Sequence, residues 1–238
     1  MIWAYYDESG EYDGDGRLLN MSIGGCVSRI EKWDSFKSAW EGALQRDGLQ
    51  RFHMTDFEAW IPPYDFKCGD GSRDNARHNN ILNSLLNMLL DHVEVFCAFS
   101  AGNQISGDSK KAHQYAIEDC TSSAISHAVH DLYGLYQQPI NLVFAKQQHF
   151  SAAKMQEYVD LYDWGDGKGR IKTASVASPS DLPQLEAADI LAYEMAREQR
   201  SRPRRYPFTT LLAGCKARKI PMTLKWSSTI RVVDQDAF

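Results

Sequence analysis

The order of strand-like and helix-like segments constrains this chain most. Two apolar segments of strand length open it, at residues 2–7 and 19–27, and a Gly/Asp-rich turn joins them. Segments with helical spacing of apolar residues then alternate with segments that suit strands. A strand pair followed by alternating helices and strands predicts an α/β domain with a mixed β-sheet flanked by helices.

The expected elements cover most of the chain. We expect helices at about 31–46, 81–90, 110–136, 151–163 and 183–200, and further strands at 93–100, 140–145 and 170–177. Gly24 and Gly25 should weaken the second strand, or mark a bulge or a close approach of another backbone. Pro203 and Pro207 are expected to limit helix formation after the last helix.

Length and local irregularity indicate one domain. At 238 residues the chain is long enough for a single large core. The segment at about 48–77, with its Pro62-Pro63 step and the stretch CGDGSRDN, predicts an irregular loop with an exposed tip. We therefore expect a single domain over residues 1–238 with an irregular insertion at about 48–77.

Composition excludes some classes of protein. The net charge of −5 does not favour nucleic-acid binding by the protein as a whole, so such binding would need a local basic patch. No apolar run approaches the ~20 residues that cross a bilayer, so no membrane partner is expected. The five cysteines are scattered, which suits reduced thiols and a cytoplasmic protein.

Two acidic motifs stand near the ends of the chain. In AYYDESG, Asp7 and Glu8 are expected where an apolar strand gives way to a turn; the alternative is that they merely begin that turn. In PQLEAADILAYEMA, Glu186 and Asp189 are three apart and share one face of a predicted helix. Hard divalent cations prefer such oxygen ligands. A buried mid-helix Asp189 needs a partner, for which a metal ion and an arginine are the candidates.

With these motifs placed, the chain resembles the domain-of-unknown-function 3800 family, which is ribonuclease-H-like in fold. The first motif resembles that family's Tyr-x-Asp-Glu-Ser-Gly opening at residues 5–10. The second resembles its Gln-x-Ala-Asp-x-x-Ala-Tyr pattern at residues 186–193. A His-x-x-Asp element, His53 to Asp56, fits as well.

The resemblance implies a central mixed sheet and carboxylates that bind divalent metal, with Asp7 on the first strand and Asp189 on the last helix. The chain departs from the pattern at two places. The strand that should end in a carboxylate ends in Ala145 and Lys146, and position 186 is Glu instead of Gln. Glu186 would replace the missing ligand, or the site is degenerate, and Lys146 would oppose cation binding.

Other candidates lie outside the two motifs. His53 and Asp56 could build a local site, although Asp56 or Thr55 could equally cap a short helix. Ser9, Asp56 and Lys146 are candidates for accessory roles. A basic cluster suits phosphate contacts, with a solvated, salt-bridged stretch as the alternative. Its members proposed to bind nucleic acid are Arg197, Arg200, Arg204 and Arg205.

The sequence therefore predicts a metal-dependent nuclease that acts on RNA or DNA through a two-metal carboxylate site. Mg²⁺ or Mn²⁺ would be held by Asp7, Glu186 and Asp189, with Glu8 or His53 nearby. The alternative is a catalytically degenerate module that binds nucleic acid or a partner protein, because Ala145 replaces the strand carboxylate. A homodimer is compatible with the many tryptophans and tyrosines.

Overall fold

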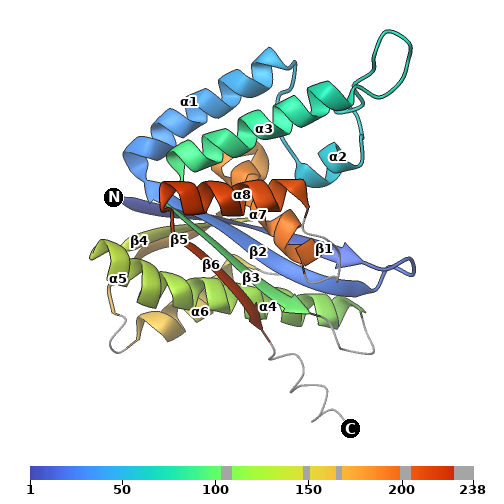
Figure 1. The fold of residues 1–238 in the computed structure, drawn as a ribbon. Helices are drawn as coiled ribbons and strands as arrows, with labels where there is room; N and C mark the ends of the chain where they lie inside the picture. The colour runs from blue at the N-terminus through green and yellow to red at the C-terminus, as the bar shows by residue number, and fades with distance from the viewer. Residues whose placement is uncertain (103–108, 147–150, 165–167, 199–204, 228–238) are drawn as a thin grey trace.

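A six-stranded mixed sheet forms the centre of the protein in a computed structural model, which describes residues 1–102, 109–146, 151–164, 168–198 and 205–227. The strand order is β5-β4-β1-β2-β3-β6 (Figure 1). The strands are β1 Ile2–Tyr12, β2 Leu18–Arg29, β3 Val95–Gly102, β4 Ile140–Ala145, β5 Ile171–Ala177 and β6 Met222–Ser227. β1, β2 and β3 pair antiparallel, whereas β4, β5 and β6 join their neighbours in parallel. The predicted mixed sheet is confirmed.

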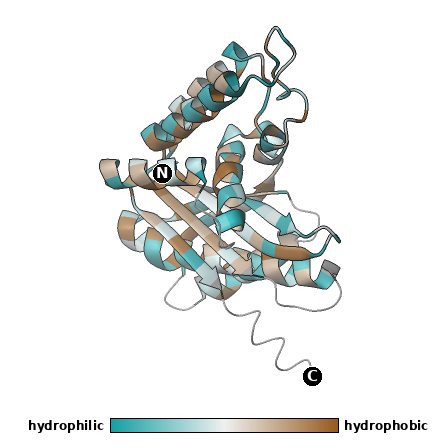
Figure 2. Cartoon of the chain, turned by 45° about the vertical axis from the view of Figure 1, so that its right-hand side comes forward, coloured by the Kyte–Doolittle hydropathy of each residue, from teal (hydrophilic) through white to brown (hydrophobic). Residues whose placement is uncertain are grey.

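Helices cover both faces of this sheet (Figure 1). On one face lie α1 Ile30–Arg46, α2 Met54–Glu58, α3 Asn75–His92, α7 Pro183–Glu198 and α8 Tyr206–Arg218. On the other lie α4 Ser109–His127, the π-helical turn Ala128–Leu132, α5 Tyr133–Tyr136 and α6 Ala152–Asp163. Each layer has its own apolar cluster, and Figure 2 shows hydrophobic colour along the central strands beside hydrophilic stretches of the outer helices.

The first strand is longer than its sequence predicts. Asp7 and Glu8 lie in the middle of β1, which stays paired with β2 as far as Tyr12, so their expected place at a strand end is wrong. Pairing with the long antiparallel strand β2 continues through Ser9 and Gly10, so the backbone of β1 keeps its hydrogen-bond partners there. β4 is shorter, and its last pair with β1 is Tyr6 with Phe144. Among the described residues, the β4 side of β1 has no strand partner beyond that pair.

Helix α7 lies closest to the sheet, across β1 and β2 (Figure 1). A Cβ atom on Gly24 would stand 2.3 Å from the backbone nitrogen of Ala192 and 2.6 Å from the carbonyl oxygen of Ala188. Ser22 Oγ donates to the Ala192 carbonyl at 2.5 Å, and Asn20 Nδ2 donates to that of Ala196 at 2.6 Å. The close approach expected at Gly24 is therefore confirmed.

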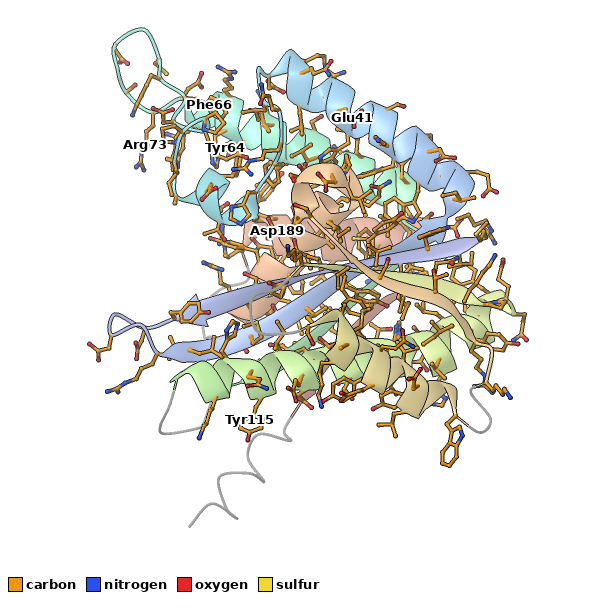
Figure 3. The ribbon with its side chains drawn as sticks, turned by 180° about the vertical axis from the view of Figure 1, so that it is seen from behind. Glu41, Tyr64, Phe66, Arg73, Tyr115 and Asp189 are labelled. Carbon is orange, nitrogen blue, oxygen red and sulfur yellow. The ribbon has the colours of Figure 1, made fainter. Side chains whose placement is uncertain are left out.

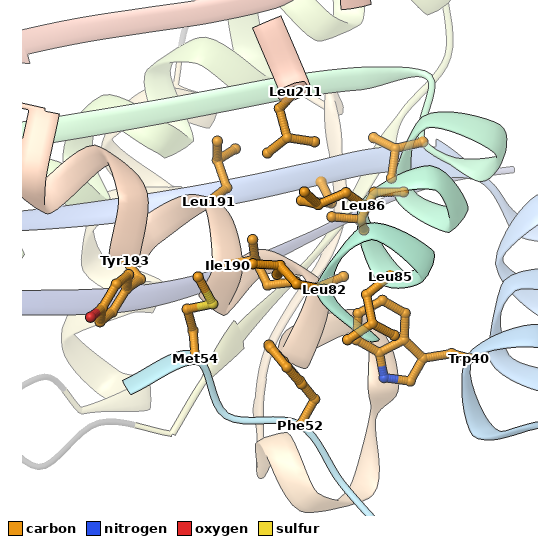
Figure 4. Packing of buried hydrophobic residues seen from close by; sticks show 14 of the residues in the cluster. Trp40, Phe52, Met54, Leu82, Leu85, Leu86, Ile190, Leu191, Tyr193 and Leu211 are labelled. Carbon is orange, nitrogen blue, oxygen red and sulfur yellow. The ribbon is translucent and has the colours of Figure 1, made fainter. Parts of the chain in front are cut away.

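The outer side of α7 packs into the larger apolar cluster. Figure 4 shows Ile190 and Leu191 among leucines of α3, with Trp40 of α1 nearby. Phe52 and Met54, which flank the start of α2, join the same cluster. Burial of these side chains fixes α7 and the segment before α2 relative to each other.

The C-terminal part differs from its prediction. Pro207 does not limit helix formation but lies in the first turn of α8, where the missing N–H has no intrahelical partner to lose. Pro203 lies outside the described residues. The parallel edge strand β6 was not predicted, and the expected helix at 110–136 contains a π-helical turn.

Two further features of the structure are the state of its cysteines and the length and polarity of its helices. All five cysteines are free; four are buried and Cys68 is exposed. None of the helices in the described parts of the chain is long and apolar enough to cross a membrane.

Candidate active site

A pocket of about 450 Å³ lies where β1 runs on past the end of β4. β1 contributes Asp7 and Glu8 to its lining, and α7 contributes Glu186 and Asp189. The remaining lining residues are Arg51, Phe52, His53, Asp56, Lys146, Ser178, Pro179 and Ser180. The N-terminal motif, the His-x-x-Asp element and the C-terminal motif, which are far apart in sequence, thus meet in one pocket.

Asp7 and Asp189 form the buried part of this pocket. Their exposed fractions are 8% and 4%, and Figure 3 shows Asp189 where α7 meets the strands. Asp7 Oδ1 accepts a hydrogen bond from the Glu8 backbone N–H at 2.8 Å, and Asp189 Oδ2 accepts one from that of Met54 at 2.7 Å. The second bond joins α7 to the first turn of α2, whose N–H groups lack intrahelical acceptors.

Ionisation of these two carboxyl groups is unfavourable in the fold. Burial raises the pKa of Asp7 well above its usual range, and the nearby carboxylates of Glu8 and Asp189 raise it further. Burial also raises the pKa of Asp189, while His53 and the Met54 N–H act in the opposite direction. Such shifts arise where charge is uncompensated, and they are typical of functional sites.

Glu186 is held by two donors. Its Oε2 accepts from Trp40 Nε1 at 2.7 Å and from the Phe52 backbone N–H at 3.0 Å. Burial raises the pKa of Glu186 to about 7, and both hydrogen bonds oppose that rise. Neither bond uses Oε1. The side chain therefore both lines the pocket and fastens the segment before α2 to α7.

Substitutions at Glu186 should separate these two roles. Glu186→Gln keeps an acceptor oxygen for Trp40 and Phe52, so we expect the free energy of unfolding to stay within about 1 kcal/mol. Glu186→Ala leaves two buried N–H donors unsatisfied and should cost about 3 kcal/mol. Urea unfolding followed by tryptophan fluorescence measures both. Equal stabilities of the two variants would contradict this account.

His53 and Asp56 form a pair at the rim. His53 Nδ1 lies 2.9 Å from Asp56 Oδ2, and the His53 side chain is about half exposed. His53 itself is the N-cap of α2, and it makes no side-chain capping bond. The alternative that Asp56 or Thr55 caps this helix is therefore wrong. Asp56 instead contacts Nδ1 of the His53 ring, and both residues line the pocket.

The donor set can be tested against a divalent cation. Among the described residues, no group of three or more His, Cys, Asp or Glu side chains is already arranged to hold a metal. The chemistry of the set nevertheless fits one: Asp7, Glu186 and Asp189 offer oxygen ligands in one pocket, and their pKa values are raised. A bound cation would supply the charge that these carboxylates lack.

Of the remaining predicted residues, those that the structure describes do not line the pocket. Ser9 is buried in β1 opposite Ser22 and does not line the pocket. Arg197 stacks over the Tyr193 ring, 3.4 Å from its centroid. Arg205 pairs with Glu58, and its Nη2 lies 3.7 Å from Glu194 Oε1. Arg200 and Arg204 lie outside the described residues.

Glu194 gives the stability a dependence on pH. Its side chain is 1% exposed, and burial raises its pKa to about 7, although Arg205 lowers it. The folded protein then binds this proton more tightly than the unfolded chain, so its contribution to stability falls as pH rises from about 4.5 through 7. We expect Glu194→Gln to flatten the stability profile between pH 5 and 8. An unchanged slope in urea unfolding would contradict this.

Sequence reasoning missed Arg51, Ser178 and Ser180 as lining residues, and Trp40 as a partner of Glu186. Arg51 stands two residues before His53, which is the only local signal of its place. Ser178 directly follows β5 and Ser180 lies in the short turn Pro179–Asp181 after it, and the ends of parallel strands collect at one sheet edge. That rule was available from the sequence.

No protein-family model matches the chain, and no curated protein matches its sequence. The structure is similar to the ribonuclease H2 from Pyrococcus horikoshii OT3, with 12% identity over 99% of this chain and 98% of that chain and a TM-score of 0.42. This likeness concerns the fold alone. The fold class rests on the sheet described above, and the domain-of-unknown-function 3800 family stays a resemblance of motifs.

Proposed function

We propose that the protein is a divalent-metal-dependent phosphodiesterase that acts on nucleic acid. One observation carries this proposal: Asp7, His53, Glu186 and Asp189, drawn from three distant segments, line one pocket. Five carboxyl groups line this pocket, and burial raises the pKa of three of them, Asp7, Glu186 and Asp189. Burying such groups together is costly for the fold unless function requires it.

Each residue has a part in this proposal. Asp7, Glu186 and Asp189 would hold Mg²⁺ or Mn²⁺, with Glu8 beside them. The metal would activate water and stabilise charge on the phosphate. His53 Nε2 would exchange a proton with the reacting group, while Asp56 fixes the ring through Nδ1. Trp40 and the Phe52 N–H would keep Glu186 in place.

Cleavage of labelled single-stranded and duplex RNA and DNA tests the proposal. We expect cleavage with Mg²⁺ or Mn²⁺, none in EDTA, and none by Asp7→Asn or Asp189→Asn. Calorimetry should show metal binding that both substitutions remove. Full cleavage by both variants would overturn the proposal.

A second function is favoured by the end of β4. Ala145 is 2% exposed and belongs to the cluster on the α7 side, one residue past the last β1–β4 pair. A carboxylate at that position would face the same layer as Asp189. Without one, the pocket would bind nucleic acid or a partner protein without cutting. A metal-inert starting protein that gains activity through Ala145→Asp would support this function over the first.

A further inference from the structure

One side of the pocket carries positive charge and hydroxyl groups. Arg51 and Lys146 line it from two separate segments, and both side chains are exposed. Within the described parts of the chain, neither forms an ion pair, although five carboxylates line the same pocket. Arg51 lowers the pKa of Glu186 by its charge but makes no ion pair with it, so both cations have donors available to an anion from outside.

The backbone fixes where these cations stand. The Lys146 N–H donates to the Ala177 carbonyl at 2.8 Å, which sets Lys146 beside the segment that carries Ser178 and Ser180. The two serine hydroxyls lie 2.8 Å apart. On the other segment, Tyr64 Oη donates to the Arg51 carbonyl at 3.0 Å. Both cationic residues are therefore anchored at the main chain, and among the described residues their charged ends form no ion pair.

We propose that Arg51, Lys146, Ser178 and Ser180 form a phosphate-binding subsite beside the carboxylates. Guanidinium, ammonium and hydroxyl groups are the donors that nucleic-acid-binding proteins direct at phosphate oxygens. This inference rests on the proposed function, because it identifies the group of the substrate that the basic side of the pocket holds. It gives Lys146 a role as a substrate ligand instead of an opponent of metal.

The charges of the pocket also link phosphate to cation. When its five carboxyl groups are ionised, the lining carries more negative than positive charge and repels an anion until a cation is added. A divalent cation at the carboxylates and a phosphate at the basic side should each strengthen the binding of the other. The subsite thus favours a substrate that brings its phosphate together with the metal.

Binding of a fluorescein-labelled single-stranded hexanucleotide tests the subsite without relying on turnover. Anisotropy is read in EDTA and in Ca²⁺ over a range of salt, with gels to verify that the probe stays intact. We expect Lys146→Ala and Arg51→Ala each to weaken binding about tenfold and to reduce the salt slope by about 1. Lys146→Arg should retain most of the affinity. Ca²⁺ should tighten binding by the starting protein.

Lys172→Ala is the matched control, because Lys172 is an exposed lysine near the opposite end of β5. It should leave affinity and salt slope unchanged. Unchanged binding by the Lys146→Ala/Arg51→Ala double variant, or no probe binding by the starting protein in either condition, would overturn the subsite. Retained cleavage by Asp7→Asn would instead overturn the proposed function, and the binding data would still decide the subsite.

Discussion

Asp7→Asn should reduce divalent-dependent cleavage at least about 100-fold and at the same time make the metal-free protein more stable. The carboxylate of Asp7 is buried beside those of Glu8 and Asp189, and its pKa is raised mainly by burial. At pH 7 the unfolded chain ionises this group freely, whereas the fold resists its charge. An amide of the same shape removes that conflict, and we expect a gain of about 1–2 kcal/mol.

Two comparisons sharpen this test. Asp189→Asn should also abolish cleavage, and its remaining amide oxygen can still accept from the Met54 N–H. Asp15→Asn removes the same charge from an exposed turn and should change neither activity nor stability. Cleavage assays and urea unfolding in EDTA give both readouts. An inactive but destabilised Asp7→Asn would show that Asp7 supports the fold instead of straining it.

The sheet could be predicted because its strands differ in periodicity from the helices between them. The length of β1 could not, because it depends on pairing with β2 beyond the last pair with β4. Asp7 and Glu8 consequently lie inside a strand. The pocket forms where β4 has ended and β1 continues. Similarly, a proline disrupts the interior of a helix but is well tolerated in its first turn, which is where Pro207 lies in α8.

The sequence could predict those members of the candidate site whose residue type and motif indicate a catalytic or metal-binding role. Asp7, His53, Glu186 and Asp189 were named from motifs, and the structure places them in one pocket. The partner of Glu186 could not be named, because Trp40 is separated from it by 146 residues and looks like an ordinary core residue. The basic side was missed for a related reason: Arg51 acquires its place only when Glu186 holds the neighbouring Phe52 N–H.

Gly24→Ala should be the most damaging glycine-to-alanine change among the glycines that the structure describes. The added Cβ would stand 2.3 Å from the Ala192 nitrogen and 2.6 Å from the Ala188 carbonyl oxygen, and both atoms belong to the helix backbone. No side chain can rotate away to relieve such contacts, so α7 must move off the sheet. We expect a loss of about 3 kcal/mol in the free energy of unfolding.

Activity should fall with stability in this variant, since α7 carries Glu186 and Asp189 while β1 carries Asp7. Gly42→Ala is the control: a Cβ there meets nothing within 4 Å, and alanine in the middle of α1 should stabilise by about 0.5–1 kcal/mol. Unfolding by urea and cleavage at a temperature where both variants are folded provide the measurements. Wild-type stability of Gly24→Ala would mean that α7 is not held at the observed distance. Normal stability with lost cleavage would mean that α7 shifts with no loss in the free energy of unfolding. Cleavage would then be more sensitive than stability to the position of α7.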